Sequence, residues 1–98
     1  MSLSKKQRLY LKRLAHHLTP VVIVGQQGLT DGVLNETALT LVTHELIKVR
    51  INSGDRVERE EMTGQIVERT GAELVQTIGH IAVLYLSNPE KPKIRLPG

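Results

Sequence analysis

Apolar positions in the first 20 residues recur with the period of a helix. Leu11, Ala15 and Leu18 are three or four residues apart, which is the spacing of one buried helix face. Ser4 and Gln7 have the spacing of a capping box, which marks a helix start. The pattern predicts a helix of about 13 residues that ends before the proline at 20. Its other face carries four cationic side chains: Lys5, Arg8, Lys12 and Arg13.

A β-branched run follows at 21–24, with an apolar residue at every position. Such a run is typical of a strand that is covered on both faces. It leads into the sequence Gly-Gln-Gln-Gly at 25–28, and Thr30 is then a favourable N-cap for a second helix. The core positions predicted for this helix are Leu34, Ala38, Leu41 and Val42.

Residues 46–51 show the alternation of a half-buried strand. Ile47, Val49 and Ile51 alternate with Lys48 and Arg50, so the outer face of this strand is expected to be basic. A turn sequence, Asn-Ser-Gly, comes directly after it.

The second half of the chain contains a third helix and a hairpin. Asp55 and Glu58 form another capping signature, and Gly71 is suited to a left-handed helix stop. Two short apolar segments, 74–78 and 81–86, meet at a Gly-His pair, which is typical of a hairpin turn. The buried positions predicted for the third helix are Val57, Met62, Ile66 and Val67.

These elements predict an α/β (α+β) fold in the order α-β-α-β-α-β-β. The last two strands form an antiparallel pair and the earlier ones are joined through helices, so the four-stranded sheet, packed with helices, must be mixed. We expect residues 1–98 to form a single domain, with a basic extended tail from about residue 88.

Composition removes several classes of function. The chain has no cysteine, which excludes disulfides, thiolate catalysis and zinc sites that need sulfur. The sequence has no apolar run near the roughly 20 residues that span a bilayer, and its start is charged rather than apolar. We therefore expect a cytoplasmic protein with no membrane partner.

The positive charge is concentrated at the two ends of the chain. Residues 1–17 contain cations and no acid, and the tail adds Lys91, Lys93 and Arg95. All 10 acidic residues lie within residues 18–90, a stretch that is net negative although the whole chain carries +3. A polyanion would meet a strong positive field if folding brings the two ends together.

The glycine loop is the first candidate for a binding site. Glycines let backbone N–H groups approach a phosphate closely, and the helix that follows adds partial positive charge. Gln26 and Gln27, between Gly25 and Gly28, can also donate to phosphate, ribose or base edges. An ordinary tight turn would give the same pattern, so the motif alone leaves both interpretations open.

The cationic face of the first helix is the second candidate, with Lys48 and Arg50 as a secondary extension. This helix has no acid three or four residues from its lysines and arginines, and an anionic partner would relieve their repulsion. Its apolar side lacks the Phe and Trp of membrane-surface helices, which favours nucleic acid. RNA is favoured over DNA because no helix-turn-helix or zinc module is present. We expect the helix and the loop to converge on one anion site.

Catalysis is not indicated by the histidines. His16, His17, His44 and His80 lack the i, i+4 spacing of metal ligands on a helix, and no serine lies in a nucleophile elbow. The sequence predicts a non-enzyme with no cofactor, no metal and no small-molecule substrate. Two alternatives stay open: a protein-interaction module, and a small hydrolase or nuclease that uses His16, His17 or His44 with a carboxylate.

Several segments together resemble one known family. The sequences LAH at 14–16, PVVIVGQQGLT at 20–30 and HELIKV at 44–49 are similar to the signature of the CRM domain (chloroplast RNA splicing and ribosome maturation). The single-domain form resembles the bacterial YhbY-like proteins. The end of the chain, with VLY at 83–85 and KI and LP later, fits the same pattern.

The resemblance implies a fold and a role. The fold would be similar to the C-terminal domain of translation initiation factor three and related in shape to KH domains. The role would be binding ribosomal RNA in precursors of the large ribosomal subunit, aiding its assembly. The family's glycine loop corresponds to Gly25, Gln26, Gln27 and Gly28, and its neighbouring basic surface to the first helix.

Overall fold

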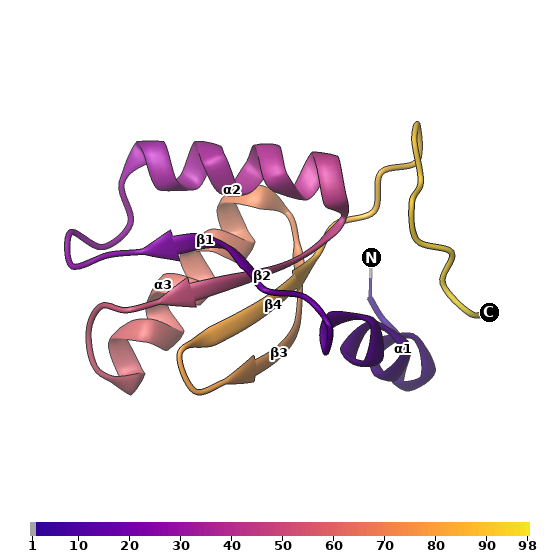
Figure 1. Cartoon of the computed structure of the whole chain (residues 1–98), viewed down its shortest axis with the longest axis horizontal. Coiled ribbons are helices and arrows are strands. Elements are labelled where there is room, and N and C mark those ends of the chain that lie inside the picture. The colour runs from indigo at the N-terminus through magenta and orange to yellow at the C-terminus, as the bar shows by residue number, and fades with distance from the viewer. Residues whose placement is uncertain (1) are drawn as a thin grey trace.

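The computed structural model describes residues 2–98 and has the predicted order of elements (Figure 1). They are α1 (Lys5–Ala15), β1 (Pro20–Val24), α2 (Asp31–His44), β2 (Leu46–Ile51), α3 (Arg56–Thr70), β3 (Glu73–Ile78) and β4 (Ile81–Tyr85). The local start and stop signals are confirmed. Ser4 and Gln7 form a capping box on α1, Asp55 and Glu58 form one on α3, and Gly71 ends α3 with a left-handed φ of 78°.

The four strands form one mixed sheet, as predicted, and their order in it is β1-β2-β4-β3. β1 pairs with β2 in parallel, and β4 pairs with both β2 and β3 in antiparallel orientation. β1, β2 and β3 therefore all end at the same edge of the sheet, where α2 and α3 begin (Figure 1). We call this edge, with the loop at 25–30, the turn at 52–54 and the turn at 79–80, the loop edge.

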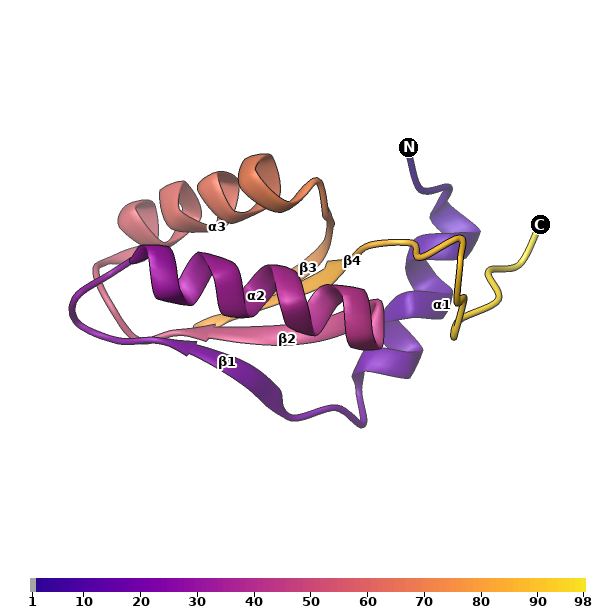
Figure 2. The ribbon, with the colours of Figure 1, turned by 90° about the horizontal axis from the view of Figure 1, so that it is seen from above.

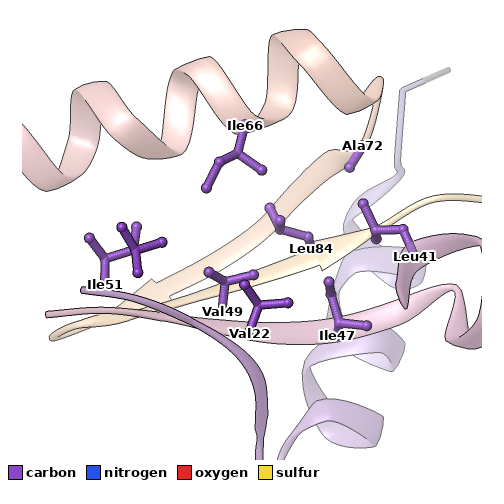
Figure 3. Packing of buried hydrophobic residues seen from close by; sticks show 9 residues of the cluster. Val22, Leu41, Ile47, Val49, Ile51, Ile66, Ala72 and Leu84 are labelled. Carbon is purple, nitrogen blue, oxygen red and sulfur yellow. The ribbon is translucent and has the colours of Figure 1, made fainter. Parts of the chain in front are cut away.

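The larger core lies between the sheet and the helices α2 and α3, which cover one of its faces. Figure 3 shows Leu41 of α2 and Ile66 of α3 over the strand residues. Buried residues of this cluster are Val22, Val24, Leu41, Ile47, Val49, Ile51, Ile66, Ala72 and Leu84. Along each strand, the residues of this cluster alternate with residues that point to the other face of the sheet, because successive side chains of a strand point to opposite faces.

A second core lies on the opposite face, where α1 packs at one end of the sheet. Leu11 and Ala15 of α1 form one buried cluster with strand residues such as Val83 and Tyr85, and Leu3 joins it from the segment before the helix. α1 and the C-terminal segment lie at the end of the molecule that is remote from the loop edge (Figure 2).

The prediction that β1 is covered on both faces is wrong. Val22 and Val24 are buried, but Val21 is 44% exposed and Ile23 is 58% exposed. β1 is the outer strand of the sheet, and α1 does not extend over this part of its second face.

Two predicted core positions of the helices are also exposed. Val42 of α2 and Val57 of α3 face solvent, whereas Thr37 and Thr63 are buried in their place. Each of these threonines donates its hydroxyl to a carbonyl in the preceding helix turn, Thr37 to Val33 O and Thr63 to Arg59 O. A hydroxyl that forms a hydrogen bond can be buried at little cost in free energy. The pattern of apolar residues alone therefore does not identify the buried face of these two helices.

The tail beyond β4 contains no helix or strand, but it folds back onto the protein. Ile94 and Leu96 pack against the second core. The amide of Gln7 donates to Pro97 O at 3.2 Å, which joins the end of the chain to the start of α1. Folding therefore brings the two basic chain ends to one end of the molecule.

Candidate functional site

The loop at 25–28 forms a tight turn between β1 and α2. Gly28 N–H donates to Gly25 O at 3.0 Å, so this amide is used inside the loop. Within residues 2–98, the N–H groups of Gln26 and Gln27 donate no hydrogen bond, and both residues are exposed. These two amides, rather than that of Gly28, are the backbone donors that an anion could reach.

The two glycines of the loop have different structural requirements. Gly28 has φ +74°, a conformation that L side chains rarely adopt, so the turn itself explains a glycine there. Gly25 has no positive φ, and a Cβ added to it would meet nothing within 4 Å. The fold therefore does not require Gly25, whereas the close approach of a ligand to the backbone would.

The start of α2 gives the loop mixed electrostatics. The Thr30 hydroxyl caps the helix by accepting from Val33 N–H at 3.2 Å. Asp31 follows in the first turn, where its carboxylate complements the helix dipole but opposes an anion.

A second group of polar side chains lies at the loop edge, and no pattern in the sequence indicates it. A cavity of about 320 Å³ between α3 and the β3–β4 hairpin is lined by Arg56, Arg59, Glu60 and His80, among others. Arg56 forms an exposed ion pair with Glu60 at 3.3 Å, and Arg59 donates to Gly54 O. The Nδ1 of His80 lies 3.0 Å from Ile51 O, so the neutral ring carries its proton on this nitrogen. The positions of these side chains relative to the glycine loop depend on the order of the strands in the sheet, which no local sequence motif reveals.

The expectation that the cationic helix and the glycine loop converge on one site is wrong. α1 precedes β1 and the loop follows it, so the length of the strand separates them (Figures 1 and 2). The two features lie at opposite ends of a molecule whose principal extents are 39 × 25 × 23 Å. A single phosphate cannot contact both.

The predicted cations of α1 differ in how free they are. Lys5 and Arg13 are exposed and Lys12 is half-buried. Arg8 instead donates through Nη1 to the carbonyls of Leu74 and Val75, so it ties α1 to β3.

Lys48 and Arg50 also make intramolecular bonds. Lys48 Nζ donates to Leu18 O at 2.9 Å, across the α1–β1 connection. Arg50 Nε donates to Asn52 Oδ1 at 2.9 Å, near the loop edge. Arg50 lies on the open face of the sheet, beside the exposed Ile23 in the β1–β2 register.

Two histidines of the hydrolase alternative, His17 and His44, lie in apolar surroundings. His17 and His44 line a cavity of about 430 Å³ together with apolar residues such as Leu14, Val21 and Leu46, and no carboxylate lines it. Across residues 2–98, no group of three or more His, Asp or Glu side chains is arranged to hold a metal ion. In the same part of the chain, no helix has the length and apolar character needed to cross a membrane.

Glu45 is the most unexpected polar residue of the fold. It is 1% exposed, has a φ of 63°, and lies between α2 and β2. Its carboxylate accepts three backbone N–H groups of the tail: Asn88 at 2.7 Å, Lys93 at 2.6 Å and Ile94 at 2.8 Å. Burial by itself would raise the pKa of Glu45, but these three donors and the charge of Lys93 outweigh it and lower the pKa.

Comparison with known proteins places the chain in a family. The model of the CRS1/YhbY (CRM) domain matches residues 3–85. An RNA-binding protein of Haemophilus influenzae is 52% identical over 96 residues, which cover 98% of this chain and 96% of that protein. A protein of Bacillus subtilis named a probable RNA-binding protein is 37% identical over 95 residues, covering 97% and 99%.

A solved structure agrees with the fold. The solution structure of a hypothetical protein from Staphylococcus aureus superimposes with a TM-score of 0.83 at 34% identity, covering 98% of this chain and 100% of that one. The family match over most of the chain, the full-length relatives and the shared fold lead to one conclusion: the chain belongs to the CRS1/YhbY (CRM) domain family.

Proposed function

We propose that this protein is a non-catalytic RNA-binding protein of the cytoplasm that associates with ribosomal RNA in precursors of the large subunit and aids their assembly. The observation that carries RNA binding is the exposed loop with two unused backbone donors, in a family whose relatives are named for RNA binding.

In this proposal the RNA makes two separate contacts. The N–H groups of Gln26 and Gln27 hold one phosphate at the loop edge. Gly25, which has no side chain, leaves room for the RNA backbone, and Arg50 lies close by. Lys5, Lys12 and Arg13 neutralise other phosphates at the α1 end. Because the two contacts lie at opposite ends of the long axis, one RNA strand must extend along the molecule.

Gly25→Asp tests the loop contact. The added Cβ meets open space and φ is not positive, so the fold should stay intact while the carboxylate repels a phosphate. We expect a loss of RNA affinity of at least about tenfold, since removing a charged hydrogen-bonding contact costs about 1.5 to 3 kcal/mol. Fluorescence anisotropy with a labelled ribosomal RNA fragment measures this.

Gly25→Asn is the matched control, because it adds nearly the same volume without charge. It should retain most of the affinity that Gly25→Asp loses. Equal affinity of Gly25→Asp and the wild type would remove the loop from the mechanism. The same test at Gly28 is less informative, because its positive φ strains any other residue.

Docking on a ribosomal protein or assembly factor is the second candidate function. It is favoured by the apolar side chains on the open part of β1, Val21 and Ile23, which a strand or loop of a partner could cover. Association that survives nuclease treatment and moderate salt would identify this function, because RNA-mediated association is lost under both conditions.

A further inference from the structure

The C-terminal segment, residues 88–97, is fixed against the rest of the protein by hydrogen bonds and packing contacts. We call it the arm. The two oxygens of the Glu45 carboxylate divide the bonds: Oε2 accepts Asn88 N–H, and Oε1 accepts the N–H groups of Lys93 and Ile94. The two anchoring points lie five residues apart in the arm, so the segment between them is closed into a loop by one side chain.

The rest of the arm lies against the second core. Ile94 and Leu96 are half-buried on it, whereas Lys93 and Arg95, which alternate with them, are exposed. The bond from Gln7 to Pro97 O fixes the far end of the arm beside α1. The backbone contacts and the alternation together orient the cationic side chains of the arm outward.

This arrangement places the basic residues of both chain ends on one end of the protein. The arm contributes Lys91, Lys93 and Arg95, with Glu90 as its one acid, and Lys5, Lys6 and Arg13 of α1 are exposed nearby. Within residues 2–98, the side chains of Lys91, Lys93 and Arg95 take part in no hydrogen bond or ion pair. Glu45, the acid at the base of the arm, is buried, and its charge is stabilised by the three N–H donors and, more weakly, by the charge of Lys93.

We propose that the arm and α1 form a composite phosphate-binding surface, and that Glu45 is the positioning residue that assembles it. The ligand is the sugar-phosphate backbone of RNA, recognised by charge without base contacts. The inference rests on the proposed function, and it adds to the α1 contact the cations of the arm, which lie outside the loop and the first helix. An anchored cation binds without the entropy loss that a mobile tail would suffer on ordering.

The test measures how RNA affinity depends on salt. The probe is a fluorescein-labelled single-stranded RNA of about 20 nucleotides, titrated from about 50 to about 200 mM salt. The triple variant Lys91→Gln, Lys93→Gln, Arg95→Gln leaves the backbone bonds to Glu45 in place. Its slope of log affinity against log salt should be shallower by up to about 2, because each phosphate contact on a single strand contributes about 0.7.

Two controls separate position from net charge. The triple variant Lys91→Arg, Lys93→Arg, Arg95→Lys keeps every charge and should keep the wild-type slope. Arg69→Gln removes one exposed charge from the last turn of α3 and should change the slope less than Lys93→Gln does. Equal slopes for the wild type and the triple glutamine variant would overturn the proposal, and so would equal effects of Arg69→Gln and Lys93→Gln.

Glu45→Gln tests the positioning role. It keeps all arm cations but presents an amide N–H₂ to a backbone N–H, so the arm should loosen. We expect faster amide hydrogen exchange at Lys93 and Ile94, together with a shallower salt slope than that of the wild type. Faster exchange with an unchanged slope would show that the arm needs no anchoring and would overturn the positioning role.

The outcomes distinguish this inference from the proposed function. RNA binding by the wild type that is lost in Gly25→Asp but unaffected by the arm substitutions would leave the proposed function standing and remove the arm. Absence of RNA binding by the wild type would remove both.

Discussion

At the residue scale, Glu45 shows how one buried side chain can organise distant segments. Its partners lie 43, 48 and 49 residues further along the chain and are all backbone N–H groups. A backbone donor is present at every residue except proline, so no sequence pattern marks these partners. No sequence pattern therefore indicates this contact, whereas local spacing predicts the capping boxes at Ser4 and Asp55, which depend on residues three positions apart.

The lowered pKa of Glu45 predicts a dependence of stability on acid. The folded protein favours the carboxylate, so its contribution is fully present above the unfolded value of 4.5 and is lost as the pH falls through the lower folded pKa. Glu45→Gln should be less stable than the wild type at neutral pH by about 1 to 3 kcal/mol, the cost of an unpaired buried donor. This difference should shrink in acid. Urea unfolding of both proteins at neutral pH and below the folded pKa measures it, and a constant difference would contradict the linkage.

At the element scale, β1 shows why an apolar run does not fix burial. The run at 21–24 has the composition of a doubly covered strand, yet only alternate residues are buried. Position in the sheet decides this, because β1 is an outer strand and α1 covers the second face only at the other end. Local pattern identified the strand correctly, but the order β1-β2-β4-β3 depends on pairings between distant segments.

Paired substitutions on β1 should show this one-sided burial. Val22→Ala removes methyl groups from the main core and should destabilise the protein by about 2 kcal/mol. Ile23→Ala, on the open face, should change stability by about 0.5 kcal/mol or less, as surface substitutions generally do. Equal losses in thermal or urea unfolding would mean that the open face is covered in solution.

At the scale of the whole molecule, the loop and the basic helix are separated because a strand lies between them. An element that precedes a strand and a loop that follows it must lie at opposite ends of that strand, and five residues of β1 span roughly 16 Å. The separation was therefore implicit in the sequence order. What the sequence could not give is the return of the tail to α1, which depends on Glu45 and on the packing of Ile94.

Two contacts at opposite ends predict a dependence on RNA length. A stacked strand at roughly 3.4 Å per nucleotide needs about 11 nucleotides to run the 39 Å long axis. Affinity should rise steeply up to this length and then level off. Oligonucleotides of increasing length, compared by anisotropy, test it. A plateau reached with strands of about half that length would mean that one end of the protein supplies all contacts.

The second core contains a natural spectroscopic probe. The chain has no Trp and no Phe, and Tyr85 is 3% exposed beneath α1. Burial raises the pKa of its phenol, a hydrogen bond with Ser87 lowers it and the Glu45 charge raises it, with a net increase above 10.0. Because the folded state favours the neutral phenol, its contribution to stability is lost as the pH rises through that higher value. In a Tyr10→Phe variant, where Tyr85 is the one remaining tyrosine, ultraviolet absorption of the phenolate in alkali thus reports the opening of α1 from the sheet, without any label.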